Sequence, residues 1–133
     1  MTASADPTRL LAGAVTDAAS LALEHEPVPA DQVVAGSPTT GYVVLDARGP
    51  GADDVDPVGS AREIGVWEMT PGAMRDVEAD EVFVVLAGDA TVEFERPALE
   101  SIVLRPGSIV RLDAGMETVW TVRETLRKVF VAP

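Results

Sequence analysis

The chain has 133 residues with 22 acidic and 10 basic side chains, a formal net charge of −12 and a single histidine. This length favours one domain, and the negative charge excludes nucleic acid and anionic membranes as partners, because like charges repel. The absence of cysteine excludes disulfide scaffolds, thiolate zinc sites and cysteine nucleophiles. No basic start precedes an apolar stretch, and the longest apolar run is too short to span a bilayer, so we expect a cytoplasmic protein.

Residues 6–25 are predicted to form one amphipathic helix. Asp6 is a suitable N-cap, and Pro7 follows at the first helical position, where its missing N–H costs nothing. Small apolar residues then recur at helical spacing, at Leu11, Val15, Ala18 and Ala22. Two prolines shortly afterwards end the pattern. We therefore expect residues 1–30 to form a peripheral helix and linker, and residues 31–133 to form the main domain.

The rest of the chain has the pattern of short β-strands separated by turns. Runs rich in β-branched residues recur about every ten residues, with glycine or proline between them. Residues 48–57, rich in Gly, Pro and Asp, form a predicted loop, and no helical pattern follows it. This favours a compact antiparallel β-barrel. The predicted strands are Tyr42 to Asp46, Ile64 to Met69, Val82 to Leu86, Thr91 to Phe94, Ser101 to Leu104, Ile109 to Leu112, Val119 to Val122 and Val129 to Val131, and the predicted turns lie at residues 71–72, 88–89, 106–107 and 114–115.

Two segments of this β-rich region carry regularly spaced glycines and one glutamate. Their marker positions are Gly72, Glu81 and Gly88 in the first segment, and Gly107, Gly115 and Thr118 in the second. These spacings resemble the two cupin motifs. The sequences around Trp67 and Trp120 are similar to the small single-domain cupins grouped with ureidoglycine aminohydrolase and with the ethanolamine-utilisation cupin. The resemblance covers residues 31–131 and implies an all-β, cupin-type double-stranded β-helix (a jelly-roll barrel), to which we add the N-terminal α-helix.

Most metal-binding positions of the cupin pattern are replaced in this chain. In that pattern a metal sits on three histidines and one glutamate. The first histidine pair falls on Arg75 and Val77, or on Met74 and Asp76 if the spacing is one residue longer, and the third falls on Thr118. Only Glu81 is retained, so the resemblance implies the fold and denies the usual metal chemistry, and we expect no metal and no other cofactor. Oxygen ligation of Mg²⁺ or Ca²⁺ by Asp76 or Asp113 is the alternative.

Strand alternation predicts a pocket inside the barrel. If Glu81 points inward, so does Phe83, and an inward Thr118 brings Trp120 with it. Apolar walls with a few convergent polar groups are typical of small-molecule sites. The predicted ligand-binding residues are Arg75, Val77, Glu81, Phe83, Thr118, Trp120 and Trp67. Alternatively, Glu81 and Arg75 form a structural salt bridge, and both tryptophans serve core or dimer packing.

Three functions are open from these residues. The first is a metal-free cupin that binds a small polar or anionic metabolite, held by Arg75 with Thr118 and Trp120. The second is an enzyme of hydrolase, lyase or isomerase type on a ureide or carboxylated metabolite, with Glu81 as the catalytic acid or base. The third is a barrel that serves only as an assembly module. We also expect a homodimer, because the resemblance implies pairing and pairing would cover an open sheet edge.

Other charged residues are interpreted mainly as surface groups. The acidic run Asp76, Glu78 and Asp80 is predicted to flank a solvated loop, and His25 to be exposed or to interact with the helix end. A charge on a barrel strand usually faces water, but a cation at the pocket rim would hold an anionic ligand. The charged strand residues to which these two interpretations apply are Glu68, Arg127 and Lys128, the only lysine of the chain.

Overall fold

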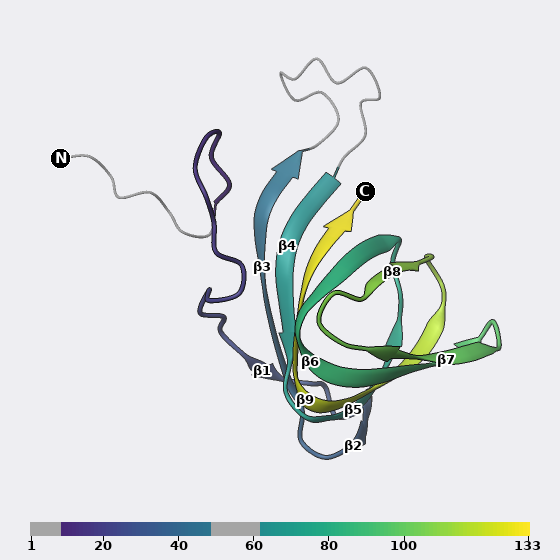
Figure 1. The fold of residues 1–133 in the computed structure, drawn as a ribbon. Helices are drawn as coiled ribbons and strands as arrows, with labels where there is room; N and C mark the ends of the chain where they lie inside the picture. Colours follow the sequence, from purple (N-terminus) through teal and green to yellow (C-terminus); the bar gives the residue numbers. More distant parts are fainter. Residues whose placement is uncertain (1–8, 49–61) are drawn as a thin grey trace.

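The computed structural model describes residues 9–48 and 62–133, which form nine β-strands and no helix (Figure 1). Every predicted strand lies within one of these strands, whereas β1, β2 and β5 have no counterpart among the strands predicted above. The predicted loop lies outside the described residues except for its first residue. In the described ranges there is no helix that could span a membrane. The strands are β1 (Glu26–Pro27), β2 (Val33–Ala35), β3 (Thr39–Arg48), β4 (Arg62–Met69), β5 (Gly72–Val77), β6 (Glu81–Arg96), β7 (Leu99–Leu104), β8 (Ile109–Leu112) and β9 (Glu117–Ala132).

The N-terminal segment is not a helix where the structure describes it. Residues 9–25 form turns and extended chain, so the helix predicted over residues 6–25 is wrong for this part, and residues 1–8 lie outside the described residues. The apolar stripe does not pack on the sheet, since Val15 is 95% exposed. A stripe of four apolar residues, two of them alanine, buries too little apolar surface to stabilise a helix of this length, which would be marginal in isolation.

The nine strands pair antiparallel and curl into a barrel (Figure 1). The hydrogen-bonded order is β1-β3-β4-β9-β5-β2, and β6 pairs with β7, β8 and β9. Strand β9 is the centre of this arrangement, because it pairs with β4 through its second half, with β5 through its first half, and with β6 along most of its length. The structure confirms the prediction of an all-β antiparallel architecture.

Strands β6 and β9 each join two predicted strands into one strand of 16 residues. The turn predicted at Gly88 and Asp89 is therefore wrong, because β6 continues through these residues with shifts in its pairing register to β9. Gly88 has a φ of +104°, and a Cβ at this position would lie 2.4 Å from the carbonyl oxygen of Thr125. Glycine here bends β6 closely around β9 without reversing the chain.

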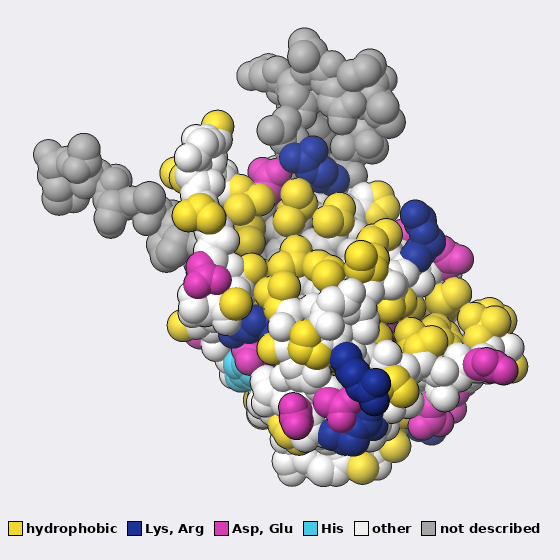
Figure 2. Space-filling model, in the orientation of Figure 1, with side chains coloured by type: hydrophobic (Ala, Val, Ile, Leu, Met, Phe, Trp, Pro, Cys, Tyr) yellow, Lys and Arg dark blue, Asp and Glu magenta, His cyan; other side chains and the backbone are white. Residues whose placement is uncertain are grey.

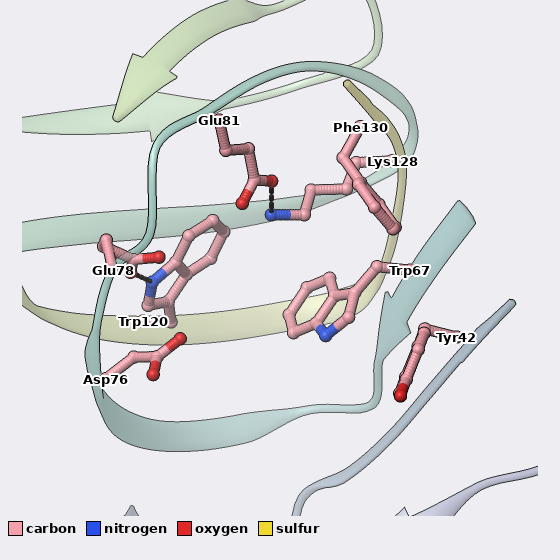
Figure 3. Close-up of a pocket in the computed structure, with 8 residues that line it drawn as sticks. All are labelled: Tyr42, Trp67, Asp76, Glu78, Glu81, Trp120, Lys128 and Phe130. Carbon is pink, nitrogen blue, oxygen red and sulfur yellow. Dashed lines mark hydrogen bonds and ion pairs between the residues drawn. The ribbon is translucent and has the colours of Figure 1, made fainter. Parts of the chain in front are cut away.

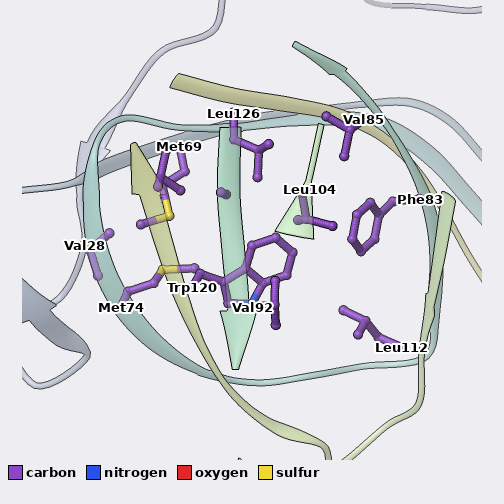
Figure 4. Close-up of a cluster of buried hydrophobic side chains, with 12 residues drawn as sticks. Val28, Met69, Met74, Phe83, Val85, Val92, Leu104, Leu112, Trp120 and Leu126 are labelled. Carbon is purple, nitrogen blue, oxygen red and sulfur yellow. The ribbon is translucent and has the colours of Figure 1, made fainter. Parts of the chain in front are cut away.

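The hydrophobic core fills the inside of the barrel (Figure 4). Phe83 and Val85 of β6 and Trp120 and Val122 of β9 are all buried, which confirms the inward alternation predicted for these strands. The rings of Phe83 and Trp120 lie 5.7 Å apart, centroid to centroid, and are tilted by 42°. Glu81 precedes Phe83 by two residues on β6, so alternation points its side chain to the same inner face, at the edge of the core.

Candidate functional site

A pocket of about 150 Å³ opens beside the core, between strands β3, β4, β5, β6 and β9 (Figure 3). The pairing register builds one of its walls: Trp67 of β4 lies opposite Tyr42 of β3 and opposite Lys128 of β9. Side chains paired in this way stand side by side on one face of a sheet. The pocket is lined by Tyr42, Trp67, Asp76, Glu78, Glu81, Trp120, Lys128 and Phe130.

A buried ion pair forms one side of the pocket. Lys128 is 5% exposed, and its Nζ donates to Oε2 of Glu81 at 2.5 Å. The same Nζ lies over three aromatic rings, 4.2 Å from the ring centre of Phe83 and 4.8 Å from those of Trp67 and Trp120. Ring faces carry partial negative charge, so they stabilise the ammonium together with the carboxylate. The buried lysine charge is thus compensated from two kinds of partner.

A second carboxylate, that of Glu78, is fixed at the opposite side of the pocket (Figure 3). Its Oε2 accepts hydrogen bonds from Thr118 Oγ1 at 2.6 Å and from Trp120 Nε1 at 2.9 Å. The backbone of Glu78 is held as well, by Met116 and Gly115 at 2.8 Å each. Glu78 is 7% exposed, so the prediction that it flanks a solvated loop is wrong. Two polar side chains of β9 supply the donors that let this carboxylate be buried.

Asp76 is the third carboxylate of the pocket, on the inner face of β5. Burial of the carboxyl and the nearby charge of Glu78 raise the pKa of Asp76 from 3.8 to about 6, against an opposing hydrogen bond from the Val77 amide. Its interpretation as a solvated loop residue is therefore wrong as well. A carboxyl with a pKa near 6 changes its protonation state close to neutral pH, which is the property that acid–base chemistry needs.

Two predicted ligand-binding residues lie outside this pocket. Arg75 and Val77 are exposed on the outer face of β5, where Arg75 Nε lies 3.5 Å from Oε1 of Glu95. The predicted inward orientation of Arg75 and its ion pair with Glu81 are wrong, because Glu81 pairs with Lys128 instead. The inward positions of β5 are Met74 and Asp76, one residue earlier, as in the alternative spacing of the first cupin motif. A shift of one residue moves every side chain of a strand to the other face.

The other predicted residues gather at the pocket. Glu81, Trp67 and Trp120 line it. Phe83 and Thr118 lie directly behind the lining: Phe83 lies under the ammonium of Lys128, and Thr118 donates to Glu78. Alternation along β6 and β9 was sufficient to find Glu81, Phe83, Thr118 and Trp120. Trp67 lies on β4 and was selected as one of two large aromatic residues. Whether any of them binds a ligand stays a prediction.

Five lining residues were not among the predicted ligand-binding residues, namely Tyr42, Asp76, Glu78, Lys128 and Phe130. For Lys128 and Phe130 the sequence did hold a signal, because both continue the even-numbered inward positions of Trp120 along β9. The predicted break between two short strands hid this continuity. Tyr42 offered no such signal, since a tyrosine at a strand start is common on surfaces and only the pairing with Trp67 brings it to the pocket.

A separate polar cluster attaches the N-terminal segment to the barrel. Arg127 Nη1 donates to the carbonyls of Ala18 and Leu21 at 2.9 and 2.7 Å, and its Nη2 donates to Glu68 at 2.7 Å. His25 shares the same Glu68 oxygen at 3.3 Å. The histidine therefore lies half-buried in this cluster and not at the end of a helix. Arg127 accordingly serves attachment, outside the pocket lining.

The cupin pattern implies a metal at Glu81, and the donor set of this chain does not fit one. Within the two described ranges, no three Asp, Glu, His or Cys side chains converge as metal ligands. The ammonium of Lys128 lies against Glu81 and would repel a divalent cation. Asp113, the alternative oxygen ligand, is exposed and does not line the pocket. No step of metal chemistry follows from these residues.

Several solved structures share this fold at low sequence identity. A Pseudomonas syringae protein of unknown function from the DUF861 family has a TM-score of 0.60 and 19% identity over 84% of this chain; the chain spans only 44% of that protein. A putative ethanolamine utilization protein Q from Salmonella typhimurium has a TM-score of 0.55 and 15% identity, over 85% of this chain and 96% of its own. The EutQ protein of Clostridium difficile has a TM-score of 0.54 and 16% identity, over 80% and 78%. No curated protein sequence matches the chain.

The curled antiparallel barrel and its pocket define a cupin-type protein. Residues 59–130, more than half of the chain, match the family of the EutQ-like cupin domain, and the chain belongs to this family. This confirms the resemblance to the ethanolamine-utilisation cupins. It does not confirm the resemblance to ureidoglycine aminohydrolase, and the structural likenesses at these identities show the fold alone.

Proposed function

We propose that this protein binds a small polar molecule in the pocket between Asp76, Trp67 and Lys128. The observation that carries the proposal is the composition of that cavity. Aromatic side chains line about 150 Å³ of space, together with three carboxyl groups and one buried ammonium. Small-molecule sites combine an apolar lining with a few convergent polar groups in this way.

The charges of the lining favour a ligand that donates hydrogen bonds or carries a positive charge. The carboxylates of Asp76, Glu78 and Glu81 outnumber the single ammonium of Lys128. An anion would be repelled, and Arg75, which the sequence suggested as its partner, lies on the outer face of β5. We therefore replace the anionic alternative with a small molecule that has N–H or O–H donors and at least one acceptor oxygen.

The Salmonella relative supports the choice of a first probe. It is described as a putative ethanolamine utilization protein. Ethanolamine carries an ammonium, which aromatic faces and carboxylates attract, and a hydroxyl that can both donate and accept. Acetamide and urea represent the neutral, donor-rich members of the same class, and acetate represents the anions that the proposal excludes.

Thermal denaturation with each probe tests the proposal. We expect ethanolamine or one of the neutral amides to raise the melting temperature with saturation, and acetate to have no such effect. A ligand at a hundred times its Kd adds about 2.7 kcal/mol to the free energy of unfolding. If none of the donor-carrying probes stabilises the protein while acetate does, the proposed ligand class is wrong.

Two variants of β5 provide matched controls for this titration. Asp76→Asn removes a pocket charge and should weaken binding of ethanolamine about tenfold, by the loss of one charge-assisted hydrogen bond. Arg75→Gln changes the neighbouring residue, which faces the opposite side of the strand, and should leave the Kd unchanged. Equal effects of the two variants would contradict a ligand in this pocket.

A second candidate function is acid–base catalysis in the same pocket, favoured by the pKa of Asp76 near 6. Asp76 is better suited to this role than Glu81, because Glu81 is held in an ion pair with Lys128. With any substrate that is turned over, Asp76→Asn should abolish the reaction. Unchanged turnover in that variant would exclude this candidate.

A further inference from the structure

We infer that Lys128 is a built-in cation of the barrel. Its ammonium occupies a cation site formed by three aromatic rings and Glu81, the one residue of the cupin metal pattern that the chain retains, and it presents N–H groups to an acceptor oxygen of the pocket ligand. The occupancy of the site stands on the geometry alone, whereas the contact with a ligand rests on the proposed function.

The protein supplies both kinds of partner that a cation site needs, a carboxylate and aromatic ring faces. The carboxylate of Glu81 binds Nζ at 2.5 Å, and the rings of Phe83, Trp67 and Trp120 surround the ammonium at 4.2 to 4.8 Å. The side chains of Lys128 and Glu81 are 6% and 15% exposed. An ammonium in such a shell is compensated by a full negative charge and by ring quadrupoles, as bound ligand cations are in aromatic cages. Here the occupant is covalently attached.

The choice of lysine is informative in a chain that otherwise uses arginine. Nine of its ten basic residues are Arg, and Lys128 is the only Lys. A guanidinium is planar, larger and forked, whereas an ammonium is a compact point charge that fits between three ring faces. The three ring faces and the carboxylate of Glu81 therefore suit a compact point charge.

The remaining hydrogen-bond capacity of Lys128 points to the ligand. An ammonium has three N–H donors, and among the described residues Lys128 donates to Glu81 alone. Lys128 also lines the pocket, together with Asp76 and Glu78 on its other side (Figure 3). A carbonyl or hydroxyl oxygen of a ligand in the cavity would accept a hydrogen bond from this ammonium. The N–H groups of the same ligand would then face the carboxylates of Asp76 and Glu78. A fixed positive charge that stabilises an oxygen of the ligand is the role that a bound metal ion usually has.

Chemical rescue tests the occupancy of the site. Lys128→Ala deletes the side chain beyond Cβ, and n-propylammonium replaces those atoms. We expect this variant to melt at a lower temperature than the wild type, and n-propylammonium to restore most of the loss with saturation. 1-Propanol, which has the same chain without the charge, should restore little of it. Equal rescue by both compounds would show an apolar plug and overturn the inference.

A double variant controls for the carboxylate. In Lys128→Ala/Glu81→Gln the site lacks its negative charge, so n-propylammonium should no longer be preferred over 1-propanol. Undiminished preference would show that the amine binds elsewhere and would contradict a cation site at Glu81.

A measurement on the wild-type protein covers the case in which Lys128→Ala does not fold. With ¹⁵N-labelled lysine, the single Lys gives one ammonium resonance in a ¹H–¹⁵N spectrum. We expect a slowly exchanging signal shifted upfield by the three rings, whereas a signal at the position of free lysine would overturn the inference. Acetamide should then shift this signal with saturation. An upfield signal that does not move when acetamide is added would refute the contact between Lys128 and the ligand. Binding of acetamide elsewhere in the pocket is reported separately, by the melting experiment.

Discussion

At the scale of single residues, the pocket is a place where carboxylates are held close together. The carboxyl group of Glu78 accepts hydrogen bonds from two donors of β9, Thr118 and Trp120. Burial of Asp76 and the nearby charge of Glu78 both disfavour its ionised form, and its side chain accepts a hydrogen bond from the Val77 amide. Ionisation of Asp76 is therefore unfavourable in this partly desolvated cavity beside a second carboxylate, and its pKa is raised to about 6.

This raised pKa predicts how the stability depends on pH. Unfolded Asp76 has its ordinary pKa of 3.8 and folded Asp76 one of about 6, so between these values the folded state holds more protons. The contribution of Asp76 to stability is therefore present below about pH 4 and is lost as the pH rises through 6. After a discount for partial exposure, we expect this loss to be about 1–2 kcal/mol.

Asp76→Asn should remove this part of the pH dependence. Chemical denaturation at pH 4.5 and pH 7 should show the variant to be more stable than the wild type at pH 7, and more nearly equal to it at pH 4.5. Asp113→Asn, at an exposed position outside the pocket, serves as the control and should change neither value. A wild-type advantage at pH 7 would contradict a desolvated Asp76.

Residue identity alone did not decide which charges meet. The sequence placed Glu81 correctly beside Phe83, because alternation within one strand is a local property. The ion pair predicted from the sequence joined Glu81 to Arg75, which is near in the chain. In the structure the partner of Glu81 is Lys128, 47 residues away. The cation at this site is therefore set by the pairing of β6 with β9, which no local pattern specifies.

At the scale of elements, β6 and β9 decide the shape of the barrel. Each strand is long enough to pair with several others, so their bends determine where the sheet curls. Gly88 is one such bend, with a positive φ and with the carbonyl of Thr125 only 2.4 Å from where a Cβ would lie. The sequence indicated a turn here because glycine followed by aspartate is a common turn pair, and only the pairing with β9 shows that the chain continues.

Gly88→Ala should therefore destabilise the protein strongly. The new Cβ would collide with backbone atoms of β9 and the residue would be strained at its φ, for which we expect a loss of about 3 kcal/mol. The measurement is the midpoint of chemical denaturation. Gly107→Ala is the matched control, because it has a similar φ of +95° but nothing within 4 Å of the added Cβ. A loss for Gly88→Ala no larger than that of Gly107→Ala, about 1 kcal/mol, would contradict the close approach of β6 and β9.

At the scale of the whole molecule, the outer face of the sheet is apolar. Hydrophobic side chains gather over β3, β4, β9 and β6 (Figure 2). The pairing register arranges them in rows across the strands, and Ile109 of β8, at the end of one row, is 74% exposed. The valines of that row are the half-buried Val43, Val129 and Val84 and the fully buried Val66. An uncharged face offers a contact that two chains of net charge −12 can share without repulsion.

We propose that a second copy of the chain covers this face, as the homodimer expected from the resemblance. Ile109→Arg should then shift the mass in solution at micromolar concentration from dimer to monomer, because a charge would be buried in the contact. Leu99→Arg, at a 52% exposed apolar position of β7, is the control and should leave the mass unchanged. A monomeric wild type, measured by sedimentation, would contradict the proposal.

Other properties of the whole molecule stay predictions from the sequence. These are the cytoplasmic location, the absence of nucleic-acid and membrane partners, and the division into residues 1–30 and 31–133. The N-terminal helix is the expectation that the structure overturned most clearly. Its local signals were sound, but Arg127 on β9 binds the carbonyls of Ala18 and Leu21 in a non-helical segment, and this distant contact outweighs a weak helical stripe.

The sequence by itself determined the β-barrel, the inward face of β6 and the first half of β9, and the loss of the metal-binding histidines. The barrel and its inward faces follow from turn residues and a two-residue period, which act over short stretches of chain. That the metal-binding positions lack histidine is what the resemblance to the cupin motifs implies. Only the tertiary structure decided the register of β5, which turns Asp76 inward and Arg75 outward, and the meeting of Lys128 with Glu81. The physical reason is that face and partner depend on how strands from distant parts of the chain pair, and a slip of one residue exchanges the two faces.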